Sequence, residues 1–267
     1  MSTPQRPPVV VTRVGLSLFG DNAFFGRSMN GEVIGVDGFW SMISQCLGGP
    51  RLDPERERCL SDIAVCAQAA DPRVWPLKLA RLISSYGSSM SGLGAALQSC
   101  EAAMIGPWTA QDAALRLESL GRLASDELPL LVPAMLAAGE RFVGYGVPLR
   151  QADERVAKMR SLMPARYPSL LGKHWAVAHA LERILIDARG LHMNISAAMG
   201  AICLDLGFSP EQIGPLVMIQ TTTSFLAHSW EGSRQRAAVL QQLPDTLVEY
   251  VGPPRRRSPR STADEDA

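Results

Sequence analysis

The segment from Asn194 to Leu206 is apolar on nearly every side and ends at Gly207. A helix of this kind has no polar face to turn toward water, so we expect it to be buried. Apolar residues at helical spacing continue through most of the chain, and extended pieces are favoured only at 9–11 and 14–19. The sequence therefore predicts an almost entirely helical protein with no internal repeat.

Local signals place the ends of several helices. Asp53 followed by Pro54 favours a helix start, and we expect that helix to continue to Ala70. Ser209, Pro210 and Gln212 form a capping-box start for the last long helix. Further helices are expected over 36–47, 74–86, 109–120, 127–142, 151–163 and 170–188. The helix that starts at Ser209 is expected to continue to about residue 236.

Two helical stretches have an unusual composition. Residues 87–106 are dominated by Gly, Ala and Ser, and such small side chains let helix backbones approach closely. Residues 220–224 form a polar run inside the otherwise apolar last helix. Because buried hydroxyls need hydrogen-bond partners, we expect partners for this run either in a cleft or across a subunit boundary.

Composition narrows the classes of partner. The chain has 267 residues, 46% of them hydrophobic, which is enough for one large domain or a large domain with a small companion. Its 26 basic residues balance 26 acidic ones, so no global field favours nucleic acid or a membrane surface. No run of 18 apolar residues and no secretory leader is visible. We expect a cytoplasmic protein without a membrane span.

Cysteine and histidine spacing indicates no metal site. The five cysteines form an odd set without a C-x-x-C pair, which favours reduced thiols over a disulfide framework or a zinc site. His174 and His179 are five residues apart and point about 140° from each other on a helix, so they do not chelate one metal together. We expect no metal and no covalently bound cofactor.

The two ends of the chain differ from the rest. Residues 1–11 are polar and proline-rich, and residues 253–267 combine proline, a basic cluster and an acidic end with few apolar residues. We expect a flexible N-terminal segment, a folded region over 12–252, and a disordered tail.

The loop over 142–158, FVGYGVPLRQADERVAK, resembles the substrate loop of the citrate synthase family, which reads roughly G-[YFI]-G-H-x-[VL]-x-[RK]…D-P-R. The start of the chain is also similar to the short citryl-CoA lyases and to the C-terminal part of ATP-citrate lyase. The end matches their A-H-x-x-E segment and their Y-V-G-P finish at 250–253. The residues of the loop that fit are Gly144, Tyr145, Gly146, Leu149, Arg150, Asp153 and Arg155.

This resemblance implies an all-α, citrate-synthase-like fold with a large and a small domain, the small one mobile and lying within about 110–205. It also implies an obligate dimer and a cleft for an acyl-CoA. Members of the family make or break the carbon-carbon bond next to a thioester. That chemistry needs a base for an α-proton and donors for the oxygens that become charged.

The chain departs from the family at each position that supplies this chemistry. Pro72, Thr109 and Val147 stand where the family has histidines, and Ser196 stands where it has the aspartate base. An arginine for a substrate carboxylate, expected in the last long helix, is replaced near Thr221. Arg155 alone clearly survives from the carboxylate clamp, and these losses argue against citrate or oxaloacetate as the ligand.

Candidate site residues follow from these correspondences. Thr109 and Ser196 either hold a thioester oxygen or a water, or only line a polar pocket; His192 is the one histidine placed to replace a lost acid-base group. These three are the candidate catalytic residues. The candidate substrate-binding residues are Arg155, Arg150, Gly144, Tyr145, Gly146, Val147 and Asn194.

Three functions remain open at this point. The first is an enzyme that uses a coenzyme A thioester as substrate in a Claisen-type condensation, or its reverse, on a partner less anionic than citrate. The second is a non-catalytic relative, a homodimer or a hetero-oligomer with an active family member, that binds an acyl-CoA or serves as a partner subunit. The third is a helical scaffold without a ligand.

Overall fold

The computed structural model describes residues 10–69, 71–100, 105–123, 127–147, 152–236, 245–247, 249 and 251–253. The expected flexible segment 1–11 and disordered tail 253–267 lie almost wholly outside these residues. The described chain is mostly helical, which confirms the predicted fold class. Its α-helices are α1 (Phe39–Cys46), α2 (Pro54–Cys66), α3 (Trp75–Tyr86), α4 (Ser89–Ser99), α5 (Pro107–Leu120), α6 (Leu128–Ala137), α7 (Glu154–Arg166), α8 (Lys173–Arg189), α9 (Ile195–Asp205) and α10 (Pro210–Gly232).

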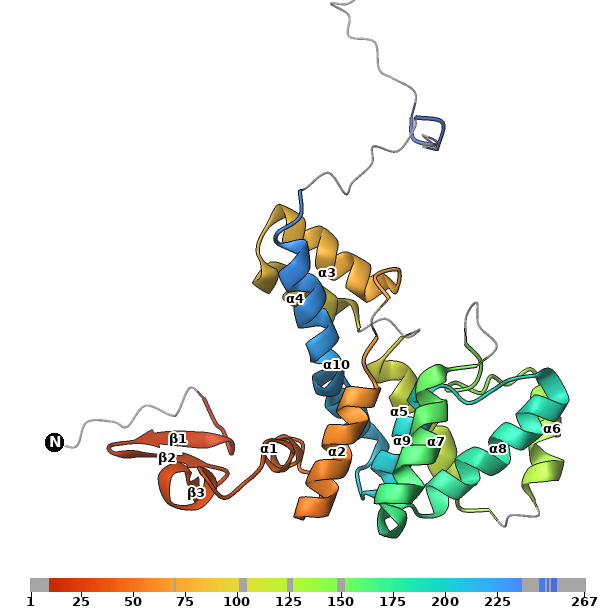
Figure 1. Cartoon of the computed structure of the whole chain (residues 1–267), viewed down its shortest axis with the longest axis horizontal. Coiled ribbons are helices and arrows are strands. Elements are labelled where there is room, and N and C mark those ends of the chain that lie inside the picture. The colour runs from red at the N-terminus through yellow and green to blue at the C-terminus, as the bar shows by residue number, and fades with distance from the viewer. Residues whose placement is uncertain are drawn as a thin grey trace, which may run out of the picture.

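A small antiparallel sheet precedes the helices and projects from them (Figure 1). Its strands are β1 (Gly15–Leu18), β2 (Asp21–Phe24) and β3 (Arg27–Ser28), and a five-residue π-helix, Met29–Val33, follows. The extended piece expected over 14–19 is confirmed as β1. Residues 10–11 are not a strand, and β2 and β3 were missed because Asp and Asn, which begin β2, are depleted in strands.

Helix α9 is the buried helix that the apolar segment predicts. Nine of its residues, from Ser196 to Leu204, are buried. It lies against α5, α7, α8 and α10, so every side of it has a helical neighbour. The all-round apolar pattern is therefore the consequence of a central place in the bundle.

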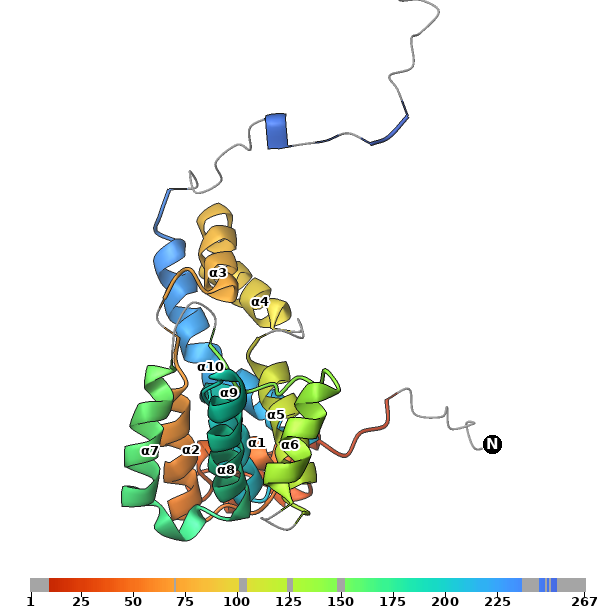
Figure 2. The same ribbon diagram turned by 90° about the vertical axis from the view of Figure 1, so that its right-hand side faces the viewer.

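Helix α10 is shared by two separate hydrophobic cores. The larger core contains residues of α1, α2 and α5–α9 together with the first turns of α10. The smaller core is formed by α3, α4 and the later part of α10. Figures 1 and 2 show α3, α4 and the end of α10 standing apart from the other helices.

The predicted helix starts agree with the structure more closely than the predicted ends. Asp53 caps α2 through the amide of Arg56, and Ser209 and Gln212 form the expected capping box. The helix expected over 127–142 ends at Ala137, and the helix expected over 151–163 begins at Glu154 and continues through Pro164. Met163 is fully buried, and we attribute this continuation to packing that outweighs the hydrogen bond lost at proline.

The stretch rich in small residues contains α4, which packs closely on α3. A Cβ atom added at Gly92 would lie 1.8 Å from the hydroxyl oxygen of Ser84 and 2.4 Å from the carbonyl oxygen of Ala80. Only glycine fits at this crossing, as the composition of the stretch predicts.

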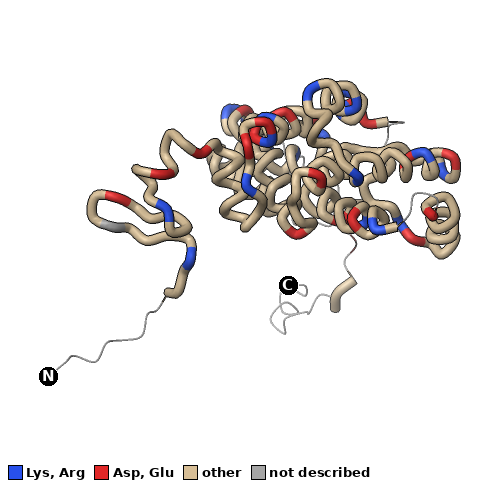
Figure 3. The backbone as a smooth tube through the Cα atoms, turned by 90° about the horizontal axis from the view of Figure 1, so that it is seen from below, with Lys and Arg blue, Asp and Glu red and all other residues tan. Residues whose placement is uncertain are grey.

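Charged residues of both signs are interspersed along the helices (Figure 3). This distribution is consistent with the balanced composition. Within the described residues, no helix combines the length and the apolar character needed to cross a membrane.

Candidate functional site

The structure brings Thr109 and Ser196 together. Thr109 lies in the first turn of α5 and Ser196 in the first turn of α9, and their hydroxyl oxygens are 2.8 Å apart. Thr109 also donates to the carbonyl oxygen of Gly106 at 2.8 Å. A hydroxyl has one proton, so the bond between the two side chains is donated by Ser196, whose oxygen keeps its acceptor capacity.

Two helix N-termini therefore converge on this hydroxyl pair. The first N–H groups of a helix have no partner within it, and the helix dipole places partial positive charge at the same end. Ser196 is 9% exposed, so it lies largely out of bulk water. An oxygen that gains negative charge beside the pair would be stabilised by both helix ends.

The loop at 144–146 is joined by hydrogen bonds to the segment that precedes α9. The amide of Asn194 donates to the carbonyl of Gly144 at 2.9 Å, and the amide of Gly146 donates to the carbonyl of His192 at 2.6 Å. The side chain of Asn194 caps α9 through the amide of Ser196 and donates to the carbonyl of Gly146 at 2.9 Å. These bonds hold the loop in register with the start of α9.

Gly144 lies between α5 and α9. Its φ is +92°, and an added Cβ atom would lie 2.7 Å from the Cβ atom of Ala197 and 2.9 Å from that of Ala113. Both the dihedral angle and the space require glycine here. The loop is thus packed at Gly144 against the two helices that carry Thr109 and Ser196.

Other residues of the loop have different surroundings. Tyr145 is buried in the larger core, where its hydroxyl donates to the carbonyl of Ala178 at 3.0 Å and burial raises its pKa. Val147, where the sequence resemblance places the family's loop histidine, is half-buried. Arg150, a candidate binding residue, lies outside the described residues.

Arg155 is held by Asp153 at the start of α7. Its Nε and Nη2 atoms each lie 2.9 Å from a carboxylate oxygen of Asp153, and its Nη1 donates to the carbonyl of Ala67 at 3.2 Å. Bidentate pairing of this kind is strong and directional. The arginine that the resemblance assigns to the family's clamp therefore already has a carboxylate partner within its own chain.

Asp153 also reaches the start of α9. It accepts a hydrogen bond from the amide of Ile195 at 3.0 Å, next to Ser196. Burial opposes the ionisation of this carboxyl, but the Arg155 guanidinium and the backbone donors outweigh that effect and hold the pKa of Asp153 below its usual value. Its role as an internal partner of Arg155 was missed, although an acid two residues before the arginine was a visible signal.

His192 lies beside a buried carboxylate that sequence reasoning also missed. Glu182 accepts from the amide of Met193 at 3.0 Å and is paired with Arg160. The Nδ1 atom of His192 is 3.9 Å from one Glu182 oxygen, and the Nδ1 atom of His179 is 3.8 Å from the other. Burial disfavours the charged carboxylate, but Arg160 and the Met193 amide outweigh it and keep the pKa of Glu182 low. A glutamate inside a helix carries no sequence sign of these contacts.

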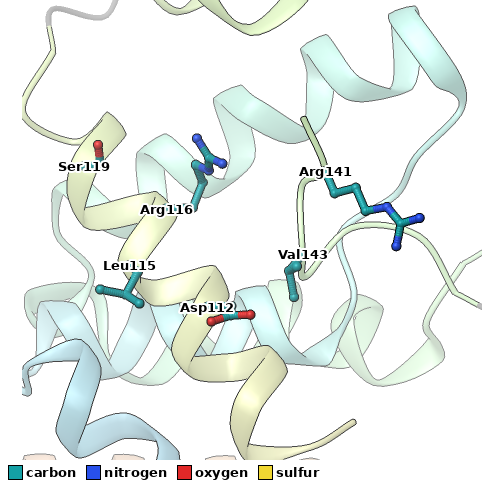
Figure 4. Close-up of a pocket in the computed structure, with 6 residues that line it drawn as sticks. All are labelled: Asp112, Leu115, Arg116, Ser119, Arg141 and Val143. Atoms are coloured by element: carbon teal, nitrogen blue, oxygen red, sulfur yellow. The ribbon is translucent and has the colours of Figure 1, made fainter. Parts of the chain in front are cut away.

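A pocket of about 310 Å³ lies between α5 and the segment that leads into the loop (Figure 4). Asp112 and Arg116 line it on the helix, one and two turns beyond Thr109, and Val143 faces them from the segment. Arg116 is paired with Glu140 at 2.8 Å, and its guanidinium lies 5.3 Å from the centre of the Phe142 ring. The other lining residues are Leu115, Ser119 and Arg141.

The sequence family described as citrate synthase, C-terminal domain, matches residues 79–240, which is more than half of the chain. The chain belongs to the citrate synthase family. The resemblance read from the loop and from the chain ends is thereby confirmed. No curated protein matches this member of the family at the level of sequence.

Solved structures of the citrate synthase family share the fold. Citryl-CoA lyase from Hydrogenobacter thermophilus is 19% identical, with a TM-score of 0.78 over 96% of this chain and 99% of that one. ATP citrate lyase from Methanothrix soehngenii, solved in complex with citrate and coenzyme A, is 18% identical, with a TM-score of 0.75 over 93% of this chain and 42% of that one. Citrate synthase from Thermoplasma acidophilum is 16% identical, with a TM-score of 0.65 over 85% of this chain and 62% of that one. At these identities the likeness concerns the fold alone.

Proposed function

We propose that this member of the citrate synthase family binds an acyl-CoA thioester beside Thr109 and Ser196 and makes or breaks the carbon-carbon bond next to the thioester, on a partner other than citrate. The observation that carries the proposal is the 2.8 Å contact between the two hydroxyl oxygens. By the sequence resemblance the two residues belong to two of the family's catalytic motifs, and their contact supports a retained site architecture with changed side chains.

The hydroxyl pair suits the stabilising part of this chemistry. An enolate or a polarised thioester has its negative charge on oxygen, and preorganised donors at that oxygen lower the barrier. Ser196 can rotate about its Cβ–Oγ bond to direct its proton to such an oxygen, and Thr109 can then turn its own proton from the Gly106 carbonyl to Ser196. We assign Ser196 the donor role and Thr109 the support of Ser196.

The charge of the site supports a substrate less anionic than citrate. Arg155, the surviving arginine of the clamp, has two of its nitrogens on Asp153 and the third on the carbonyl of Ala67. A ligand carboxylate would have to compete with a buried internal carboxylate for this guanidinium. A reaction partner that presents a carbonyl or hydroxyl group in place of a carboxylate does not need to displace Asp153 from Arg155.

The pocket between α5 and the loop supports coenzyme A as the carrier. Arg141 and Arg116 line it, and guanidinium is well matched to phosphate. Arg116 is paired with Glu140 at 2.8 Å, so a phosphate on Arg116 would have to compete with that carboxylate. Thr109 lies three residues before Asp112 and seven before Arg116, so it lies on the same side of α5 as these two lining residues. A thioester at the hydroxyl pair could therefore extend toward these cations.

A second candidate is a non-catalytic acyl-CoA-binding or partner subunit, as a homodimer or with an active family member. Among the described residues, no carboxylate or imidazole forms a hydrogen bond with the hydroxyl of Thr109 or Ser196. A hydroxyl without an activating base is a poor base near neutral pH. This observation favours binding without turnover.

Mass-spectrometric detection of coenzyme A thioester turnover separates the two candidates. The purified protein is incubated with panels of acyl-CoAs and carbonyl partners, and with β-hydroxyacyl-CoAs for the reverse reaction. Turnover that falls at least about tenfold in Ser196→Ala, but not in the surface control Ser161→Ala, would support catalysis at the proposed site. Binding without turnover would favour the second candidate, and native mass spectrometry of the protein from its cell extract would then show whether an active family member is bound.

A further inference from the structure

Gln220 is the exception in the polar run over 220–224 of α10. Two threonines of the run donate their hydroxyls to carbonyls one turn earlier in the helix, and the hydroxyl of Ser224 donates to the side chain of Gln68. Gln220 is 1% exposed, and neither its side-chain nitrogen nor its side-chain oxygen has a hydrogen-bond partner among the described residues. Buried polar groups without a partner are uncommon in folded proteins, so this carboxamide calls for a physical reason.

The side chain of Gln220 lies on the face of α10 that packs into the larger core. Residues three and four positions apart share one face of a helix, so Gln220 lies on the same face as Leu216 and Val217. Both of these residues are buried in the larger core. The carboxamide of Gln220 therefore faces the interior, on the side of α10 that α5 and α9 cover.

This part of α10 lies beside the beginning of α5. A Cβ atom added at Gly214 would lie 2.6 Å from Oε1 of Gln111, so the two helices touch there. They run in opposite directions, since α5 enters the larger core from α4 and α10 leaves it toward α4 (Figures 1 and 2). Gln220 follows Gly214 by about 9 Å along α10, and α5 begins about 6 Å before Gln111. Gln220 therefore lies close to the end of α5 that carries Thr109.

A second set of contacts connects Gln220 to the neighbourhood of Arg155. The Nε2 atom of Gln68 donates to the backbone carbonyl of Gln220 at 2.6 Å. The carbonyl of Ala67, the preceding residue, accepts from Nη1 of Arg155 at 3.2 Å. The unpaired carboxamide thus adjoins both the end of α5 that carries one of the paired hydroxyls and the segment that holds the candidate arginine.

We propose that Gln220 selects the reaction partner of the acyl-CoA, and that this partner is an uncharged carbonyl compound with a hydroxyl group that binds the Gln220 carboxamide. The inference rests on the proposed function and adds the chemical class of the second substrate. The partner's carbonyl lies at the hydroxyl pair, and its hydroxyl group lies at Gln220.

The two ends of the carboxamide decide the class of ligand. The Nε2 atom of Gln220 only donates and its Oε1 atom only accepts, so a complete match needs a group that does both. A carboxylate only accepts and would place its negative oxygens beside Oε1, and an ammonium only donates. A hydroxyl group is the smallest uncharged group that both donates and accepts. The bonds lost from water when the carboxamide was buried are then replaced in the complex.

Urea unfolding without ligand tests whether the carboxamide is unpaired in the free protein. Gln220→Met keeps an unbranched side chain of similar length, and Gln98→Met is the matched control because Gln98 is an exposed glutamine within α4. We expect Gln220→Met to keep or raise the urea concentration at the midpoint, because no unpaired amide is then left in the interior. Gln98→Met should leave the midpoint unchanged. A lower midpoint for Gln220→Met would overturn the proposal.

Turnover of an acyl-CoA with hydroxyacetone and with butanone tests the contact itself. The two ketones differ by a hydroxyl group in place of a methyl group. In the unsubstituted protein we expect hydroxyacetone to react at least about 100 times faster than butanone, because butanone leaves the buried carboxamide unpaired. Gln220→Met should reduce this ratio to below about threefold, and Gln98→Met should keep it. A ratio near one in the unsubstituted protein, or an unchanged ratio in Gln220→Met, would overturn the proposal.

Thermal unfolding separates failure of this inference from failure of the proposed function. An acyl-CoA that raises the unfolding temperature of the unsubstituted protein and of Gln220→Met equally shows that its site is intact in the variant. An unchanged ketone preference in that variant then overturns this inference alone. If the protein binds without turnover, the further shift that each ketone gives the acyl-CoA complex replaces the rates, with the same expected preference. No shift with any acyl-CoA would overturn the proposed function and this inference with it.

Discussion

The hydroxyl oxygens of Thr109 and Ser196 lie 2.8 Å apart although the residues are separated by 87 positions in the sequence. By the resemblance of the sequence motifs, Thr109 corresponds to a histidine of the citrate synthase family and Ser196 to its base aspartate. On this correspondence, the contact joins the two motifs through a neutral pair in place of an ionisable one. Hydroxyls at both positions can still hold an oxygen atom of a ligand.

The two hydroxyls are expected to be energetically coupled. Thr109→Val and Ser196→Ala each remove one partner and leave the other hydroxyl without it, so the double variant should be more stable than additivity predicts, by about 1 kcal/mol. Urea unfolding of the four proteins measures this coupling. Strict additivity would show that the contact contributes nothing to the folded state.

Asp153→Asn should destabilise the protein by about 2 kcal/mol. The amide keeps an acceptor for Ile195 but loses the charge that faces Arg155 in a buried place. Asp187→Asn, on the exposed side of α8, is the control and should change stability by less than about 0.5 kcal/mol. Equal effects in the two variants, measured by urea unfolding, would contradict the assigned pairing.

The same carboxyl makes stability depend on pH. The pKa of Asp153 lies below its model-peptide value of 3.8 in the folded protein, so the unfolded chain binds its proton more readily. The stabilisation that the ionised Asp153 gives the folded protein is fully present above the unfolded pKa, and it disappears as pH falls through the lower pKa of the folded state. Asp153→Asn should therefore show a shallower loss of stability below about pH 4 than the unsubstituted protein. Parallel acid-unfolding curves would count against this.

Gly144→Ala should be more damaging than Gly139→Ala. Both glycines have positive φ, but an added Cβ at Gly139 has no atom within 4 Å, whereas at Gly144 it meets Ala113 and Ala197. We expect a loss of about 1 kcal/mol at Gly139 from backbone strain and about 3 kcal/mol at Gly144 from strain and overpacking. Thermal or urea unfolding gives both values, and similar losses would mean that the loop can move away from α5 and α9.

Thiol reactivity should follow burial. Burial raises the pKa of Cys59 to about 12 and also raises that of Cys203, while Cys46 is exposed. Since the thiolate is the reactive form, a short pulse of iodoacetamide on the native protein should label Cys46 and spare the other two. Peptide mass spectrometry reads the result, and labelling of Cys203 at the rate of Cys46 would show that α9 opens readily.

Local sequence signals predicted much of the fold. The cap at Asp53, the capping box at Ser209 and the apolar segment before Gly207 each depend on a few adjacent residues, and each is confirmed. Strand β2 could not be predicted, because residues of low strand propensity are held there by pairing with β1.

The candidate site was predictable only where the family resemblance supplied positions. It indicated Thr109 and Ser196 together, and the structure places them in contact. The internal partners of these positions depend on tertiary packing. Glu182 beside His192 has no signature in local sequence, because that contact is made between segments that pack only in the folded chain. Asp153 is the exception, since it precedes Arg155 by two residues and its pairing with that arginine was visible in the sequence.

Binding of acyl-CoAs at the hydroxyl pair tests the central claim most directly. Thermal unfolding is followed with coenzyme A and a panel of acyl-CoAs, for the unsubstituted protein, for Ser196→Ala and for the surface control Ser161→Ala. We predict that at least one acyl-CoA raises the unfolding temperature, that Ser161→Ala keeps this shift, and that Ser196→Ala reduces it. No shift with any acyl-CoA at a concentration of about 1 mM, or an equal shift in Ser196→Ala, would contradict the account.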